Sequence, residues 1–342
     1  MTSNTVFMLN EYRARQAKAQ RNFAAAIEHS MAAADAATRV NDSRGFCRMT
    51  FNTAELQLEL GRIEGCIATC RNLLATEAIK DYPDYESRAR VLITHALQDK
   101  GETGGALAAA REAADLAQQR LPSETRFNIQ HVLIAALAEE GDTETAWAEA
   151  LILADMLSAD ATPRVKGMTH WAIGNVGFMS GRIEEGLKHH RLAADSLGLA
   201  NDVRTWALFN KASVNMRLVA GLVDAETKDC LERAEVASDV AGVTEMDRIE
   251  IVITRAWWEL ESGNAAAAEG LLWSVEKRAA TSYPVLQGRT LLLLARCLCT
   301  LERKAEALQC ALQSERIFAE VGAAVLASES RTIIDTIELI VP

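Results

Sequence analysis

Hydrophobic and small residues recur along this chain in blocks of about forty. The stretch 172–194 shows one block, in which two segments with apolar residues at helical spacing are separated by Ser180 and Gly181. Similar turns fall at Arg21, Gly61, Gly101, Gly141, Gly181, Gly221, Gly263 and Glu302. The residue numbers of successive turns differ by 40 in the first five steps, then by 42 and 39. This period predicts one helix–turn–helix unit per block, with helices of about 16 residues each.

A pattern of small side chains follows the predicted turns. An apolar or small residue stands two positions after most turns. A small residue stands five positions after seven of the eight, at Ala26, Cys66, Ala106, Ala146, Gly186, Ala268 and Ala307. Small side chains there allow the second helix of a pair to lie close to the first. The turn at Gly221 is the poorest match, because Glu226 takes the small position and the pattern slips before Ala234.

Prolines locate the helix starts independently of the turns. Pro83, Pro163 and Pro284 each stand eighteen positions before a turn, and Pro122 stands nineteen before one. Proline is tolerated in the first turn of a helix and not in its interior, and Thr162 before Pro163 is a predicted N-cap. The chain is therefore predicted to be all-α, with eight helix pairs and a C-terminal capping helix over 322–342.

The block around Gly181 resembles a tetratricopeptide repeat. The resemblance rests on Ile173-Gly174-Asn175, the run GRIEEGL that begins at Gly181, His190 and Ala193, and it extends over nearly the whole chain. The spacing departs from the usual period of roughly 34 residues, and the aromatic residue expected early in each first helix is mostly absent. The resemblance implies a right-handed α-solenoid of about eight repeats that forms a single domain over 1–342. The longer repeats of this chain are similar to those of tetratricopeptide sensor modules in bacterial regulators and of some scaffold proteins.

Charge and the N-terminal sequence favour a cytoplasmic protein that does not bind nucleic acid or membrane directly. The formal charge of -11 repels nucleic-acid phosphate and anionic lipid, so we expect no direct contact with nucleic acid or membrane. The N-terminus lacks the pattern of a signal peptide, and no apolar run is long enough to span a bilayer. The seven cysteines are odd in number and scattered through helical patterns, which predicts reduced thiols in the core.

No motif predicts catalysis, a cofactor or a metal. The glycine-rich run 101–105 falls on a predicted turn and lacks the preceding strand that a phosphate-binding loop requires. Glu185 and His189 have the spacing of metal ligands on one helix face, as do Cys66 and Cys70, but neither pair has a third ligand nearby in sequence. We therefore expect a protein that is not an enzyme.

The first helices of tetratricopeptide pairs line a concave surface. The resemblance places on it the residues 13, 10, 9, 6 and 3 positions before each turn, which include seven basic and three acidic side chains. Cations, amides and aromatic rings at these positions predict a groove for an acidic or carboxylate-bearing peptide. The predicted groove residues are Arg48, Asn52, Arg88, His95, Asn128, His131, Trp171, Asn175, Lys211, Asn215, Trp257, Arg289 and Arg296.

These patterns favour a non-catalytic, regulatory scaffold or sensor that binds a protein or peptide on its concave face. The alternative is an assembly element that forms a homodimer through its terminal repeats. It is motivated by the apolar residues of 331–342, which a capping helix also explains: Ile333, Ile334, Ile337, Leu339, Ile340 and Val341. Related modules often precede an output domain, so we expect a partner chain or a longer form of this chain to supply one.

Overall fold

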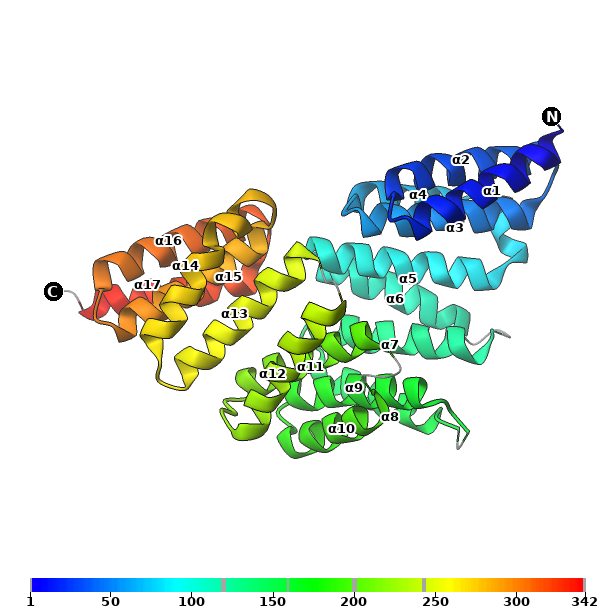
Figure 1. Cartoon of the computed structure of the whole chain (residues 1–342). Helices are drawn as coiled ribbons and strands as arrows, with labels where there is room; N and C mark the ends of the chain where they lie inside the picture. Colours follow the sequence, from blue (N-terminus) through cyan, green and yellow to red (C-terminus); the bar gives the residue numbers. More distant parts are fainter. Residues whose placement is uncertain (1, 118–120, 159, 199–201, 242–243, 341–342) are drawn as a thin grey trace. The chain divides into compact units, whose positions relative to one another are not determined.

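The computed structural model describes residues 2–117, 121–158, 160–198, 202–241 and 244–340 (Figure 1). These residues form α-helices and one short 3-10 helix, and no strand occurs among them. The all-α prediction is confirmed. Residues 341–342 of the predicted cap lie outside the described part. The chain divides into two compact units, Met1–Met156 and Leu157–Pro342, here called the N-terminal and C-terminal units.

The N-terminal unit is a stack of antiparallel helix pairs. Each helix packs against the helices before and after it, and the first helices of successive pairs, α3, α5 and α7, also contact one another. Its helices are α1 (Ser3–Ala19), α2 (Phe23–Arg39), α3 (Ser43–Glu59), α4 (Ile63–Leu74), η1 (Glu77–Asp81), α5 (Pro83–Lys100), α6 (Thr103–Ala117), α7 (Ser123–Glu139) and α8 (Thr143–Asp155).

The C-terminal unit repeats this arrangement. Its first helices α9, α11, α13 and α15 contact one another in order, and α17 packs against α15 and α16. Its helices are α9 (Pro163–Met179), α10 (Ile183–Ser196), α11 (Val203–Val219), α12 (Ala225–Ala241), α13 (Glu245–Glu261), α14 (Ala265–Ser282), α15 (Pro284–Thr300), α16 (Lys304–Glu320) and α17 (Ala324–Ile340).

The proline and capping signals mark the starts of the helices they were expected to start. Helices α5, α9 and α15 begin at Pro83, Pro163 and Pro284. The Thr162 hydroxyl accepts a hydrogen bond from Val165 N at 3.3 Å, as predicted for an N-cap. The slip after Gly221 also has a local cause. Helix α12 begins only at Ala225, because the intervening Asp224 caps it.

The backbone reverses through a left-handed residue at each of the eight aligned turns. Gly181 has φ 73°, its N–H donates to Phe178 O at 3.1 Å, and Arg182 N donates to Gly177 O at 2.7 Å. These two bonds form a Schellman motif, which satisfies the last carbonyls of the helix. Arg21 (φ 57°) and Glu302 (φ 61°) adopt the same conformation although they carry a side chain, at a cost of roughly 1 kcal/mol each.

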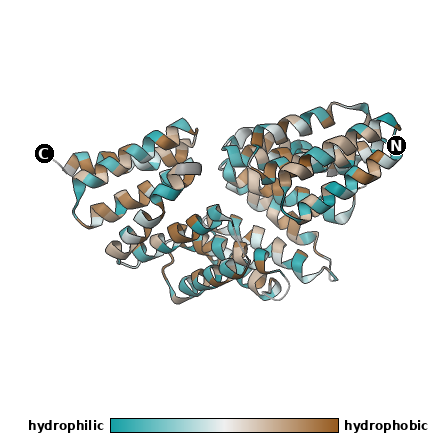
Figure 2. Cartoon of the chain, turned by 45° about the horizontal axis from the view of Figure 1, so that its top comes forward, coloured by the Kyte–Doolittle hydropathy of each residue, from teal (hydrophilic) through white to brown (hydrophobic). Residues whose placement is uncertain are grey.

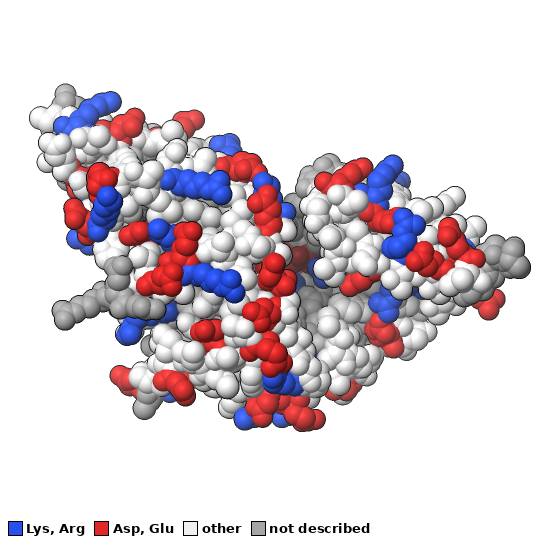
Figure 3. Space-filling view, turned by 180° about the vertical axis from the view of Figure 1, so that it is seen from behind, with Lys and Arg blue, Asp and Glu red and all other residues white. Residues whose placement is uncertain are grey.

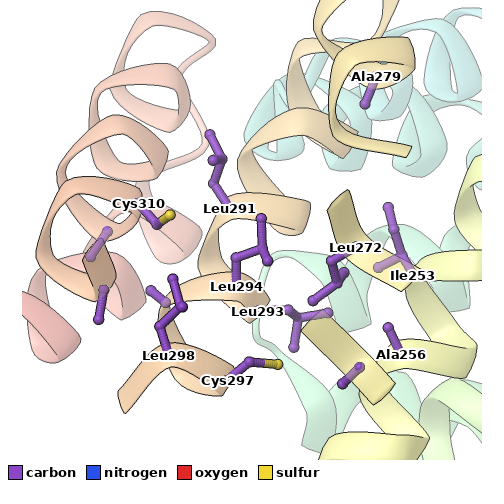
Figure 4. Close-up of a cluster of buried hydrophobic side chains, with 14 of the residues drawn as sticks. Ile253, Ala256, Leu272, Ala279, Leu291, Leu293, Leu294, Cys297, Leu298 and Cys310 are labelled. Carbon is purple, nitrogen blue, oxygen red and sulfur yellow. The ribbon is translucent and has the colours of Figure 1, made fainter. Parts of the chain in front are cut away.

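The small residues five positions after the turns lie at the crossing points of the helix pairs. Six of these residues are completely buried, with 0% exposure: Ala26, Cys66, Ala106, Ala146, Ala268 and Ala307. The larger apolar side chains pack around these points, so hydrophobic residues concentrate on the faces between helices (Figure 2). In the last repeats, Leu272, Leu291, Leu294 and Leu298 converge from α14 and α15 into one buried cluster (Figure 4).

Helices α9 and α10 approach through glycines. A Cβ on Gly177 would lie 2.8 Å from Gly186 N, and a Cβ on Gly186 would lie 2.9 Å from the Phe178 ring. Real Cβ atoms do not come this close, so backbone and ring occupy the space that side chains fill elsewhere. The pair therefore packs more closely than an alanine would allow.

The space beside Gly174 is occupied by a buried histidine, His190. Its ring packs against Phe178 and Phe209, with ring centroids 5.0 and 5.6 Å away. His190 Nε2 lies 3.0 Å from Asn175 Oδ1, and Nδ1 lies 3.0 Å from Ser213 Oγ. Because an amide oxygen only accepts, Nε2 carries the proton and the Ser213 hydroxyl donates to Nδ1. The neutral ring is thus fully hydrogen-bonded, and burial lowers the pKa of His190 to about 3.

Replacing Gly177 with alanine should destabilise the C-terminal unit by about 1–3 kcal/mol, since the new methyl group meets backbone that cannot rotate away. Gly270→Ala is the matched control. Gly270 is an exposed helical glycine with open space around its Cβ position, and alanine there should raise stability by up to ~1 kcal/mol. Urea unfolding of both variants measures the difference, and equal midpoints would contradict the close packing.

The buried His190 should make folding sensitive to mild acid. Its pKa is lower in the folded chain than the unfolded value of about 6.5, so the unfolded state alone takes up the proton between these values. Stability is therefore complete above about pH 6.5 and declines as pH falls, by about 2 kcal/mol for this group at pH 5. Urea midpoints measured from pH 7.5 to 5 should decline less steeply in His190→Gln. An unchanged slope would mean that His190 titrates normally.

Candidate functional site

The first helices of the last pairs enclose a cavity in the C-terminal unit. It has a volume of about 420 Å³ and is bordered by α11, α13, α15 and α17. Its lining residues are Asn215, Val219, Glu250, Ile253, Thr254, Trp257, Leu286, Arg289, Leu292, Leu293, Arg296, Leu326, Glu329, Thr332 and Ile333. The cavity therefore lies on the face that the tetratricopeptide resemblance predicts as concave.

The lining follows the repeat period. Asn215, Thr254, Leu293 and Ile333 come from four consecutive first helices, each about one period after the one before. Thr254, Leu293 and Ile333 occupy the same position in their helices, whereas Asn215 lies about one helical turn further along α11 and contacts Thr254. Together the four residues form a row that runs across the helices. This first row is polar at α11 and α13 and becomes apolar at α15 and α17.

A second row alternates in charge. It consists of Lys211, Glu250, Arg289 and Glu329 on the same four helices. The last three occupy the same position in α13, α15 and α17, and Lys211 lies about one helical turn further along α11. Lys211 Nζ forms an ion pair with Glu250 Oε2 and a second one, at 3.4 Å, with Asp247 Oδ1. The α11–α13 half of this charge row is thus closed by its own ion pairs.

Several other polar groups at the cavity form hydrogen bonds within their own helix or with a neighbouring helix. The Thr254 hydroxyl donates to Asn215 Oδ1 at 3.2 Å. Glu261 Oε1 accepts from Trp257 Nε1 at 3.0 Å and from Arg296 Nη2 at 2.6 Å. These contacts orient the Trp257 ring along the cavity wall and neutralise the Arg296 guanidinium.

Arg289 differs from the other predicted groove cations. It lines the cavity and is half-buried, yet it makes no hydrogen bond or ion pair with the residues that the structure describes. Its surroundings within the cavity are largely apolar, with Leu286, Leu292 and Leu293 on its own helix. A guanidinium in this position is partly desolvated, and no carboxylate of the described residues compensates the free energy lost with its hydration.

Three predicted groove residues of the N-terminal unit, Arg48, Asn52 and Arg88, already have internal partners. Arg48 pairs with Glu11 at 2.9 Å, and Asn52 donates to Ser30 Oγ at 2.8 Å. Arg88 lies 3.8 Å from a carboxylate oxygen of Glu55, and its guanidinium stacks 4.4 Å from the Phe51 ring centre. The basic excess of the predicted groove is therefore largely neutralised within the fold. Basic and acidic side chains are likewise intermingled on the surface that Figure 3 shows.

The remaining candidates fall at other places. His95 is exposed and contacts Gln98, Asn128 is exposed on α7, and burial lowers the pKa of His131 to about 4. Trp171 packs edge-on against Phe209, and Asn175 holds His190, so both belong to the core between α9 and α11. The cavity brings together four of the thirteen candidates, namely Asn215, Trp257, Arg289 and Arg296.

Two parts of the cavity were not predicted from the sequence, namely the residues of α17 and the apolar floor. Helix α17 supplies Leu326, Glu329, Thr332 and Ile333 to the cavity. Counting back from turns could not find them, because no further turn was identified after α17. A step of one repeat period from Arg289 does reach Glu329. The apolar lining was missed because leucine and isoleucine at these positions are indistinguishable from core residues in the sequence.

The structure describes no group of three or more His, Cys, Asp or Glu side chains that could hold a metal ion. All seven cysteines are free thiols, and burial raises the pKa of Cys297 and Cys310 to about 11. None of the described helices combines the length and the hydropathy that crossing a lipid bilayer requires.

No protein-family model matches the chain, and no curated protein sequence matches it. Solved structures are similar. The apo form of the quorum sensor NprR from B. thuringiensis superposes with a TM-score of 0.67 and 11% identity, over 91% of this chain and 88% of that one. A tetratricopeptide repeat protein from Parabacteroides merdae superposes with a TM-score of 0.56 and 11% identity, over 86% and 99% of the two chains.

A third similar structure is a Rap protein complexed with competence and sporulation factor. Its TM-score is 0.54, with 15% identity over 90% of this chain and 78% of that chain. Identities this low show the fold alone. Together with the helix pairs, the left-handed turns and the rows of equivalent positions, they lead to one conclusion: the chain is a tetratricopeptide-like helical repeat protein with an α-solenoid fold.

Proposed function

We propose that the C-terminal unit binds a protein or peptide segment in the cavity of α11, α13, α15 and α17, and that the chain is a non-catalytic sensor or scaffold. The observation that carries this proposal is the position of Arg289 in a largely apolar cavity, without a partner among the described residues. The segment carries an acidic side chain or a terminal carboxylate that pairs with Arg289.

Arg289 is the favoured anchor because binding there breaks no existing contact with the described residues. An anion that approached Arg48, Lys211 or Arg296 would compete with an internal carboxylate at each of them. At Arg289, the incoming carboxylate supplies the partner that the guanidinium lacks. A hydrogen bond to a charged group contributes roughly 1.5–3 kcal/mol in such a setting.

The cavity also favours an apolar side chain next to the acidic group. Its volume of about 420 Å³ falls in the range of roughly 300–1,000 Å³ that is typical of ligand sites. Its apolar lining comes from four different helices, with Val219, Ile253, Leu293 and Ile333 among the residues that contribute. Filling it with a leucine-sized side chain would remove apolar surface of both partners from water, at about 25 cal/mol per Å².

Two of the similar structures support a sensing role. One is a quorum sensor, and the other was solved in complex with competence and sporulation factor.

Self-association through the terminal helices is the second candidate. The observation in its favour is the exposure of apolar side chains on both of them, Met8 and Tyr12 on α1, and Val325 and Leu339 on α17. On α17, however, Ile334 and Ile337 are buried against the core, and the exposed apolar residues are separated by charged and polar ones. A homodimer is therefore the less supported proposal.

Selection of a random displayed peptide library against the chain tests the binding proposal. Wild type should enrich peptides with Asp or Glu next to a large apolar residue. Thr332→Trp places an indole at an exposed position of the cavity lining and should abolish this enrichment. Ser328→Trp, on the same helix outside the lining, is the control. Enrichment that survives Thr332→Trp would place the binding elsewhere.

The contribution of Arg289 is measured with a synthetic copy of an enriched peptide. Arg289→Gln should weaken its binding about tenfold, because a charge-assisted hydrogen bond is lost. Arg48→Gln removes a cation that Glu11 already neutralises and should leave the affinity unchanged. Isothermal titration gives both values. Equal affinities for wild type and Arg289→Gln would contradict the anchor.

A further inference from the structure

The charge row of the C-terminal unit contains a second group without a partner, Glu329 on α17. Glu329 lines the same cavity as Arg289, is exposed, and makes no hydrogen bond or ion pair with the residues that the structure describes. Arg289 and Glu329 stand one repeat period apart, at equivalent positions of neighbouring first helices. In the charge row they follow Lys211 on α11 and Glu250 on α13.

The two halves of the row differ in one respect. The Lys211 ammonium reaches the Glu250 carboxylate directly and closes the first half. Arg289 and Glu329, both within the described part of the chain, form no such pair, although their charges are opposite and their helices are in contact. Both side chains line the same cavity, the cation on α15 and the anion on α17.

We propose that the segment bound in this cavity carries a basic group close to its acidic group, with the acid on Arg289 and the base on Glu329. This inference rests on the proposed function and narrows its ligand class. A segment that is acidic throughout would satisfy Arg289 but bring a like charge toward Glu329, which disfavours binding. A segment with both charges completes the row in the way that Lys211 and Glu250 complete each other.

The apolar floor sets where the two charges of the ligand lie. Leu293 and Ile333 each stand four positions after a member of the charge row, Arg289 and Glu329 respectively, so they form the adjacent row one helical turn away. An apolar side chain of the ligand packs on this row while its two charged groups point toward the charge row. The expected ligand motif is therefore an acid and a base flanking or neighbouring one large apolar residue.

Glu329→Gln tests this inference in the same peptide selection. Peptides enriched by wild type should carry an acidic residue, a basic residue and a large apolar residue. Glu329→Gln should still enrich the acid and the apolar residue but lose the requirement for the base. Glu338→Gln, an exposed residue of α17 outside the lining, should enrich the same peptides as wild type.

A double-mutant cycle quantifies the contact. Replacing the basic residue of an enriched peptide with glutamine should weaken its binding to wild type about fivefold, the upper end for an exposed ion pair. The same replacement should have no effect on binding to Glu329→Gln.

The possible outcomes separate this inference from the proposed function. If wild type enriches purely acidic peptides, the basic group is excluded and the acidic-peptide site stands. If Thr332→Trp enriches the same peptides as wild type, both the site and the inference are wrong. If the peptide base contributes equally in wild type and Glu329→Gln, its partner is a different residue and the inference is wrong.

Discussion

The close crossing of the two helices in each pair is the contact on which this structure depends. In seven of the eight pairs, the fourth residue of the second helix is alanine, cysteine or glycine and is buried against the first helix. A larger side chain there would push the helices apart and open the core between successive pairs. The left-handed turn residue matters for the same reason, since it aims the second helix back along the first.

The pair α9–α10 shows how the repeat accommodates a polar group at this contact. Glycines at 174, 177 and 186 bring the helices together and leave room for the His190 ring. Asn175 and Ser213 then supply one acceptor and one donor, so the neutral imidazole costs no unsatisfied hydrogen bond. The segment with the strongest tetratricopeptide resemblance thus uses its polar residues Asn175 and His190 in packing.

Stacking the pairs brings charged residues of successive first helices into rows. In several of these rows a cation meets a carboxylate from a neighbouring helix, as in Arg48 with Glu11 and Lys211 with Glu250. Such pairing stabilises the stack modestly, and an anionic ligand would have to compete with the internal carboxylate for the cation. Arg289 and Glu329 line the cavity, and neither forms an ion pair or hydrogen bond with the described residues. This combination distinguishes one part of a repetitive surface from the rest.

The sequence alone determined the helix pairs, their turns and their starts, because these follow from local signals. Left-handed turn residues, small residues at the crossing and prolines at helix starts act within one repeat, so Gly181, Gly186 and Pro163 can be interpreted without knowing the fold. The sequence also indicated the first helices as the binding face, with Arg289 among the candidates. Which candidate cation lacks a described partner was decided only by the tertiary structure. That property depends on whether a carboxylate from an adjacent repeat reaches the guanidinium, and Arg48 and Arg289 look alike until their neighbouring helices are in place.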